Sequence, residues 1–113
     1  KNKFPVILCG DFNADPNSDE IRMITGHRNP IEEIVLRDSW NMTNPESPGF
    51  TWSNKNSYAK KTLESDRRID YIFVGKAGAK GLGHPLSTVL VGTEENNSLF
   101  PSDHFGIMAH LAG

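Results

Sequence analysis

The apolar run from residue 4 to residue 9 limits the fold more than any other feature of the sequence. It reads Phe-Pro-Val-Ile-Leu-Cys and ends at Gly10. A continuous apolar stretch this short, followed by glycine, favours a strand buried on both faces over a helix. A chain of 113 residues buries a smaller share of its surface than a full-sized enzyme domain does. The strand needs covering layers on both sides, so any missing partner surface matters to the stability of the fold.

Two helices are predicted after this strand. Asn17 or Ser18 caps the first, Glu20 lies in its first turn, and Gly26 ends it. The second is indicated between residues 29 and 35, because an asparagine precedes a proline at the first helical position. Its residues are Asn29 as the cap, Pro30, the acidic Glu32 and Glu33, and the apolar Ile31, Ile34 and Val35.

The rest of the chain reads as strands joined by polar loops. The composition predicts a short strand over 50–52, longer ones over 68–74 and 86–91, and a last one over 105–111, where apolar residues alternate. The order is strand, helix, helix and then several strands. This order predicts an α+β fold with one mixed β-sheet that carries helices on one face, and the other face needs a partner.

Composition indicates a globular protein without disulfides or membrane helices, and it leaves phosphate binding and the compartment undecided. Hydrophobic residues make up 36% of the chain and charged residues 23%, which is typical of one globular unit. The formal net charge of -2 gives no general attraction for nucleic acid, although Lys60, Lys61, Arg67 and Arg68 form a basic cluster that either binds phosphate or is an ordinary solvated loop. The single Cys9 excludes an internal disulfide. No apolar run approaches the roughly 20 residues of a membrane helix, and the compartment, cytoplasmic or secreted, stays open.

Three short segments place polar groups where a strand ends or runs buried. They are Gly10-Asp11-Phe12-Asn13, Arg68-Ile69-Asp70-Tyr71 and Ser102-Asp103-His104. In an extended segment Asp11 and Asn13 point the same way, so a carboxylate and an amide can converge on one ligand. The alternative is a turn in which both side chains bond the local backbone.

Asp70 interrupts an otherwise apolar strand, where an unpaired carboxylate is costly. His104 is the candidate partner, because an aspartate that accepts the imidazole N–H fixes the tautomer and raises the basicity of the other nitrogen. The alternative partner is Arg67 or Arg68, in a salt bridge that only joins the strand to its loop. The other three histidines, His27, His84 and His110, read as structural or exposed.

Taken in order, Gly-Asp-Phe-Asn, Thr-Trp, Arg-Ile-Asp-Tyr and Ser-Asp-His resemble the second half of the endonuclease/exonuclease/phosphatase (DNase I-like) superfamily, over nearly the whole chain from Val6 to Leu111. The resemblance implies a four-layered α/β/β/α sandwich, of which residues 1–113 are the C-terminal half and supply one sheet with its helices. The reaction implied is metal-dependent hydrolysis of a phosphodiester or phosphomonoester, and nucleic acid is one candidate substrate. The Arg-Ile-Asp-Tyr segment is unlike that of the inositol polyphosphate 5-phosphatases.

The resemblance also implies roles for single residues. Asp11 would orient or deprotonate the attacking water, Asn13 would bind the phosphate, and Asp70 would hold His104 against the scissile phosphate. Asp103 would lie near a divalent metal, Mg²⁺ or Mn²⁺, which suits hard oxygen ligands. The residues expected to line or support the pocket are Thr51, Trp52 and Arg68, although Trp52 also fits ordinary packing.

The family's first half carries the glutamate that is its principal metal ligand, and no segment of this sequence matches it. The metal site is therefore expected to be incomplete, and the isolated chain inactive. The partner expected is the missing N-terminal half or a second copy bound through the bare sheet. Two other readings stay open: a non-catalytic module that dimerises or binds a partner, and a cluster of Asp and His residues that holds only a structural ion.

Overall fold

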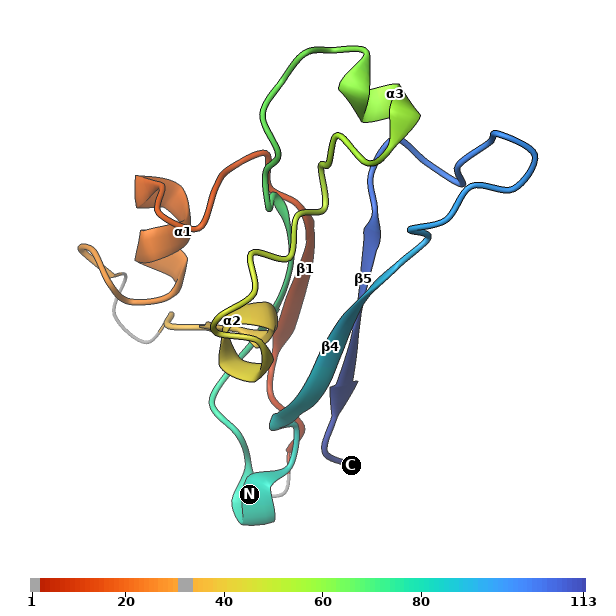
Figure 1. Ribbon diagram of the computed structural model, residues 1–113. Helices are drawn as coiled ribbons and strands as arrows, with labels where there is room; N and C mark the ends of the chain where they lie inside the picture. Colours follow the sequence, from red (N-terminus) through yellow and green to blue (C-terminus); the bar gives the residue numbers. More distant parts are fainter. Residues whose placement is uncertain (1–2, 31–33) are drawn as a thin grey trace.

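The computed structural model describes residues 3–30 and 34–113, in which two small β-sheets lie beside short helices (Figure 1). The first sheet has the strand order β1-β3-β2, built from β1 (Ile7–Asp11), β2 (Arg37–Asp38) and β3 (Asp70–Val74). The second is the pair β4 (Pro85–Val91) and β5 (Gly106–Leu111). All of these pairs are antiparallel. The helices are α1 (Asp19–Ile24), α2 (Ser39–Thr43), α3 (Ser57–Lys60) and a 3-10 turn over Ala79–Gly81.

The predicted α+β class is confirmed, but the strands do not form the one mixed sheet that was expected. Strand β3 pairs with β1 and β2, whereas β4 and β5 pair with each other. The reason is that β4 and β5 are joined by the loop over 92–105 and pair with each other in an antiparallel hairpin. The chain thus contributes strands to two sheets rather than one.

Helix α1 covers one face of the first sheet and makes the core there. Ser18 caps it as predicted, accepting a hydrogen bond from the Ile21 amide, and the chain leaves it through Gly26 at a φ of 83°. Ile21 packs on Tyr71 and Phe73 of β3, which are both buried. Phe12 completes this core by meeting both rings edge-on, at centroid distances of 5.8 and 5.2 Å.

The second predicted helix falls largely on residues 31–33, which lie outside the described residues. The described segments on either side of it, 27–30 and 34–36, are not helical. Two other helices were not predicted. Both α2 and α3 are too short to be stable alone, and tertiary contacts stabilise them. Gly49, at a φ of 58°, leaves room for the Trp40 ring of α2, because a Cβ there would lie 2.2 Å from it.

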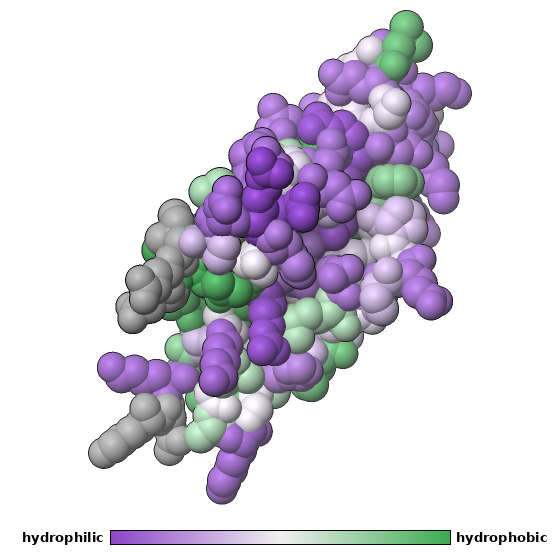
Figure 2. Space-filling model, turned by 90° about the vertical axis from the view of Figure 1, so that its left-hand side faces the viewer, coloured by the Kyte–Doolittle hydropathy of each residue, from purple (hydrophilic) through white to green (hydrophobic). Residues whose placement is uncertain are grey.

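Strand β1 forms where the apolar run predicts it, but it is not buried. Ile7 and Leu8 are 47% and 41% exposed, so the described part of the chain covers each of them only in part. Leu86, Val89 and Met108 of the second sheet are exposed as well. Figure 2, which views the α1 side, shows a mostly hydrophilic upper part with an apolar tip, and apolar patches in the lower part. In residues 3–30 and 34–113 no helix has the length and apolar character to cross a membrane.

Candidate functional site

Two carboxylates face each other at one end of the first sheet. In the antiparallel register of β1 and β3, Asp11 lies directly opposite Asp70. Each aspartate ends or begins its strand, so both side chains lie at the rim of the sheet. Like charges directly opposite each other destabilise a strand pair unless a cation or hydrogen-bond donor lies between them. A positively charged partner at this rim would therefore stabilise the pairing of β1 and β3.

His104 fills that position from the segment that leads into β5. Its Nδ1 lies 2.8 Å from Oδ2 of Asp70, and its Nε2 lies 3.7 Å from Oδ2 of Asp11. The first distance is a hydrogen bond, whereas the second is too long for one. The alternative partners for Asp70, Arg67 and Arg68, make no salt bridge to it among the described residues. The structure thus brings Asp11, Asp70 and His104 together.

The pKa of His104 is raised above its usual value. Burial of the ring lowers the pKa, but the hydrogen bond to Asp70 and the negative charges of Asp70, Asp11 and Asp103 raise it by more. A protonated imidazole is therefore favoured between these carboxylates.

Thr51 holds both strands of this site in place. Its hydroxyl oxygen accepts hydrogen bonds from the backbone amides of Ile69 and Asp70, each at 3.2 Å. Its carbonyl oxygen accepts one from the amide of Phe105 at 2.7 Å. Thr51 is 1% exposed, so it supports the site from behind and does not line it. One threonine thereby fixes the residues next to the Asp70–His104 contact on both sides.

Asn56 is a second support, and no local sequence pattern singles it out. Its side chain is fully buried, donates to the carbonyl oxygen of Ser102 at 2.7 Å, and accepts from the amide of Tyr58 at 2.9 Å. Ser102 in turn accepts a hydrogen bond from the His104 amide at 3.1 Å. Asn56 therefore caps α3 and positions the segment that carries His104, a role visible only in the tertiary structure.

Asn13 lies beside Asp11 but is turned by its backbone. Its amide donates to Oδ1 of Asp11 at 2.9 Å, and its φ of 49° places it in the left-handed region that asparagine tolerates. The side-chain oxygen of Asn13 contacts Arg67 at 3.4 Å. The turn of the alternative interpretation is therefore present for Asp11, whose carboxylate bonds the local backbone, whereas the side chain of Asn13 contacts Arg67 instead. Asn13 stays at the rim with Asp11.

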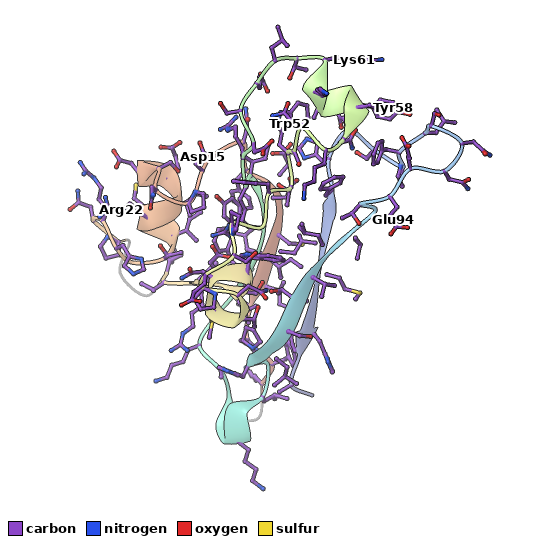
Figure 3. All side chains as sticks on the ribbon, viewed as in Figure 1. Asp15, Arg22, Trp52, Tyr58, Lys61 and Glu94 are labelled. Atoms are coloured by element: carbon purple, nitrogen blue, oxygen red, sulfur yellow. The ribbon has the colours of Figure 1, made fainter. Side chains whose placement is uncertain are left out.

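A groove of about 450 Å³ opens beside these residues and is called the His104 groove here. Trp52 is part of its wall and meets the His104 ring edge-on at 5.2 Å. Figure 3 shows Trp52 above the ends of β1 and β3, between the loop of Asp15 and α3. The residues that line the groove are Asp11, Phe12, Asn13, Trp52, Glu64, Arg67, Ile69 and His104.

Arg68, expected at the pocket, does not line the His104 groove. Its guanidinium is buried and bonds Oδ2 of Asp38 at 2.7 Å. The neighbouring Arg67 lines the groove instead. Successive residues of an extended segment point to opposite sides, so only one of the two arginines can face the site.

The residues present suit a divalent cation. Asp11, Asp70 and His104 each offer one ligand atom, and these atoms lie within 4.8 Å of one another. The carboxylates suit Mg²⁺ and Mn²⁺, whereas an imidazole that is protonated on both nitrogens has no lone pair for a metal. Asp103 is exposed and is not part of this cluster. Its carboxylate accepts a hydrogen bond from the Ser102 hydroxyl at 3.3 Å.

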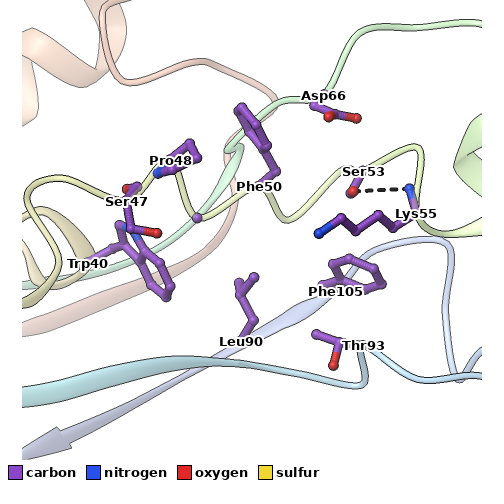
Figure 4. A pocket seen from close by; sticks show the side chains of 11 residues that line it. Trp40, Ser47, Pro48, Phe50, Ser53, Lys55, Asp66, Leu90, Thr93 and Phe105 are labelled. Carbon is purple, nitrogen blue, oxygen red and sulfur yellow. Dashed lines mark hydrogen bonds between the residues drawn. The ribbon is translucent and has the colours of Figure 1, made fainter.

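The structure has two other hollows near the His104 groove or the second sheet. A cleft of about 350 Å³ lies on the inner side of the same cluster, between β1 and β3 on one side and β5 on the other. A further hollow of about 420 Å³ lies between Trp40, Phe50, Leu90 and Phe105 (Figure 4). None of Asp11, Asp70 and His104 lines that second hollow, so its shape does not bear on their chemistry.

The sequence is 25% identical to Nocturnin from Xenopus laevis over 114 residues, which is 96% of this chain and 27% of that protein. The chain thus spans roughly a quarter of the length of this curated relative. The sequence model of the endonuclease/exonuclease/phosphatase family matches residues 1–104, a range that includes Asp11, Asp70 and His104. Because this match covers most of the chain and all three residues of the cluster, the chain belongs to the endonuclease/exonuclease/phosphatase family.

Proposed function

We propose that residues 1–113 supply one half of a phosphoesterase active site, which hydrolyses a phosphodiester or phosphomonoester with an activated water and a divalent metal. The observation that carries the proposal is the position of His104 between Asp70 and Asp11, at 2.8 and 3.7 Å. The family description, which names nucleases and phosphatases, supports the reaction class.

Asp70 and His104 form the phosphate-binding part of the proposed mechanism. Asp70 accepts the Nδ1–H of the imidazole, which fixes the ring and leaves Nε2 facing the rim. The raised pKa of His104 favours an Nε2 that carries a proton. That N–H would donate to a phosphate oxygen and stabilise the negative charge that develops in the transition state.

Asp11 orients the water. The 3.7 Å between its Oδ2 and Nε2 of His104 is too long for a direct hydrogen bond, and it leaves room for an oxygen atom next to both groups. Asp11 is half exposed, so water reaches it. The side-chain amide of Asn13, on the same rim, would bind the phosphate.

Mg²⁺ or Mn²⁺ would supply Lewis-acid stabilisation of the phosphoryl oxygens when bound. The carboxylates of Asp11 and Asp70 are the candidate ligands, with Asp103 as a more exposed acidic group nearby. Since Asp70 already bonds His104, this chain provides few free ligand atoms. We therefore propose that the N-terminal half of the domain completes the metal site, and that residues 1–113 alone are inactive.

The test compares hydrolysis of bis(p-nitrophenyl) phosphate by residues 1–113 and by the longer polypeptide in which a complementary first half precedes them. The longer polypeptide should be active with Mg²⁺ or Mn²⁺, and EDTA should abolish the activity. The His104→Gln variant should lose most of it, whereas His110→Gln, which changes an exposed histidine of β5, should keep it. Robust metal-dependent turnover by residues 1–113 alone, or an active His104→Gln variant, would contradict the proposal.

A second candidate is a non-catalytic module that dimerises or binds a partner. The observation that favours it is the exposure of the apolar β1 side chains, which need a cover. Activity separates the two candidates, because a module of this kind would show no His104-dependent hydrolysis in the longer polypeptide.

A further inference from the structure

The His104 groove contains one side chain with a permanent positive charge. Among its lining residues, all of which the structure describes, this is Arg67. Its guanidinium contacts both the side-chain oxygen and the carbonyl oxygen of Asn13 at 3.4 Å. It thus adjoins the amide that is proposed to bind the scissile phosphate.

The guanidinium of Arg67 is only weakly engaged within the chain. Its Nε lies 3.3 Å from Asp15, and its remaining contacts are 3.4 Å long. Charge-assisted bonds between arginine and carboxylate are usually about 2.7–2.9 Å long. Arg68 makes such a bond, at 2.7 Å to Asp38, and it is buried. The side chain of Arg67 is 31% exposed, so its N–H donors remain accessible to a ligand.

The backbone holds Arg67 at the edge of the groove. The amides and carbonyls of Arg67 and Trp52 pair in an antiparallel bridge, at 2.9 and 2.8 Å. Trp52 in turn lies against the His104 ring. The base of the arginine side chain is therefore fixed relative to the reacting groups, and only its outer part has to adjust when a ligand binds.

We propose that Arg67 binds a second, non-scissile phosphate group of the substrate. The inference rests on the proposed function for the position of the scissile phosphate. A planar guanidinium binds two phosphate oxygens at once, and this gives affinity and orientation. The preferred substrate thus carries at least two phosphates, either on one sugar, as in a nucleic-acid backbone, or joined directly, as in a diphosphate.

The other charged side chains at the groove are acidic and repel a phosphate group. The carboxylates of Asp11 and Glu64 also line it, and Asp15 competes for Arg67. Any affinity for a second phosphate therefore depends on Arg67. Removing the negative charge of Glu64, which is exposed and has no role in the proposed mechanism, should strengthen binding of a doubly phosphorylated ligand.

The experiment measures ligand binding by calorimetry to the full-length polypeptide, at fixed ionic strength. The probes are deoxythymidine monophosphate, deoxythymidine bisphosphate with a phosphate on both sugar hydroxyls, inorganic phosphate and pyrophosphate. We expect one of the two probes that carry two phosphates to bind about tenfold more tightly than its single-phosphate partner, a ratio equal to about 1.4 kcal/mol. Which of the two shows this preference identifies the source of the second phosphate.

Arg67→Gln should abolish the preference, Arg67→Lys should keep part of it, and Glu64→Gln should increase it. The matched control is Arg28→Gln, because Arg28 makes a similar exposed contact with Asp19, at 3.4 Å, and does not line the groove. Equal affinities in the unchanged protein, no binding of any probe, or a preference that survives in Arg67→Gln would each overturn the inference. An Arg67-dependent preference in a protein without His104-dependent hydrolysis would instead remove the proposed function and leave the anion site.

Discussion

The imidazole Nδ1 of His104 lies 2.8 Å from Oδ2 of Asp70, a residue 34 positions earlier in the chain. The contact joins the first sheet to the segment that leads into the second, because Asp70 begins β3 and His104 precedes β5. It also places the imidazole against two carboxylates that the strand register sets opposite each other. The geometry of the site therefore depends on how the two sheets are held together.

Asp70→Asn should lower the pKa of His104. Burial of the ring would remain and lower the pKa, while the charge and the charge-assisted hydrogen bond that raise it most would be lost. NMR titration of the imidazole measures the change. Asp103→Asn is the control, because Asp103 makes the smallest of the contributions that raise the pKa. In an active longer polypeptide, Asp70→Asn should also reduce the rate by about a hundredfold or more.

Stability should depend on pH through His104. The pKa of this group is higher in the folded chain than in the unfolded chain, where it is about 6.5. Its contribution to stability is therefore fully present below about pH 6.5 and is lost as the pH rises through the folded-state pKa. Urea unfolding of the unchanged protein and of His104→Gln measures this. The difference between their free energies of unfolding should shrink from acid to mildly alkaline pH, and a difference that grows with pH would contradict the assignment.

Thr51→Val should disturb the site without changing its lining. The substitution leaves the amides of Ile69 and Asp70 without their acceptor in a buried place, at a cost of about 1–3 kcal/mol. Thr51→Ser keeps the hydroxyl and should restore most of the stability and of the raised His104 pKa. Thermal unfolding and the NMR titration measure the two effects. Thr93→Val, at an exposed threonine, should change neither.

The sequence predicted the positions of the strands of the site better than it predicted how they pair and what packs around them. The strand predicted over 68–74 appears as β3, which begins two residues later than predicted. The strands predicted over 86–91 and 105–111 appear as β4 and β5, and each of their ends lies within one residue of the prediction. Local composition suffices here, because β-branched and aromatic residues fit a pleated sheet. Sequence order also indicated the pair Asp70 and His104, which the structure brings into contact. Their catalytic roles stay a proposal.

Other features depend on long-range pairing, which local sequence does not encode. The separation into two sheets follows from which strand pairs with which. The choice between Arg67 and Arg68 depends on the register of their segment, because alternation shows that they diverge but not which one faces the groove. The burial of Asn56 depends on Ser102, 46 positions away. Each of these three features is visible only in the tertiary structure.

Breaking the buried ion pair of Arg68 should destabilise the fold strongly. Asp38→Ala would leave the guanidinium buried without its partner, and such losses cost about 3–5 kcal/mol. Arg68→Met together with Asp38→Leu removes both charges and should cost much less. Chemical denaturation of the single and double variants measures the difference. A double variant no more stable than Asp38→Ala would show that packing on Tyr71, rather than charge, dominates at this position.

Residues 1–113 produced alone should self-associate through β1. This strand is at one edge of its sheet, and Val6 and Leu8, which point the same way, are 69% and 41% exposed. An apolar edge strand of this kind pairs readily with another chain. Sedimentation should show dimers or larger species, and Val6→Lys with Leu8→Lys should shift them to monomer. Leu63→Lys is the matched control, because Leu63 is 92% exposed but lies in a loop. If the isolated chain were strictly monomeric and well ordered, exposure of β1 would be tolerated, and this strand would need no covering partner.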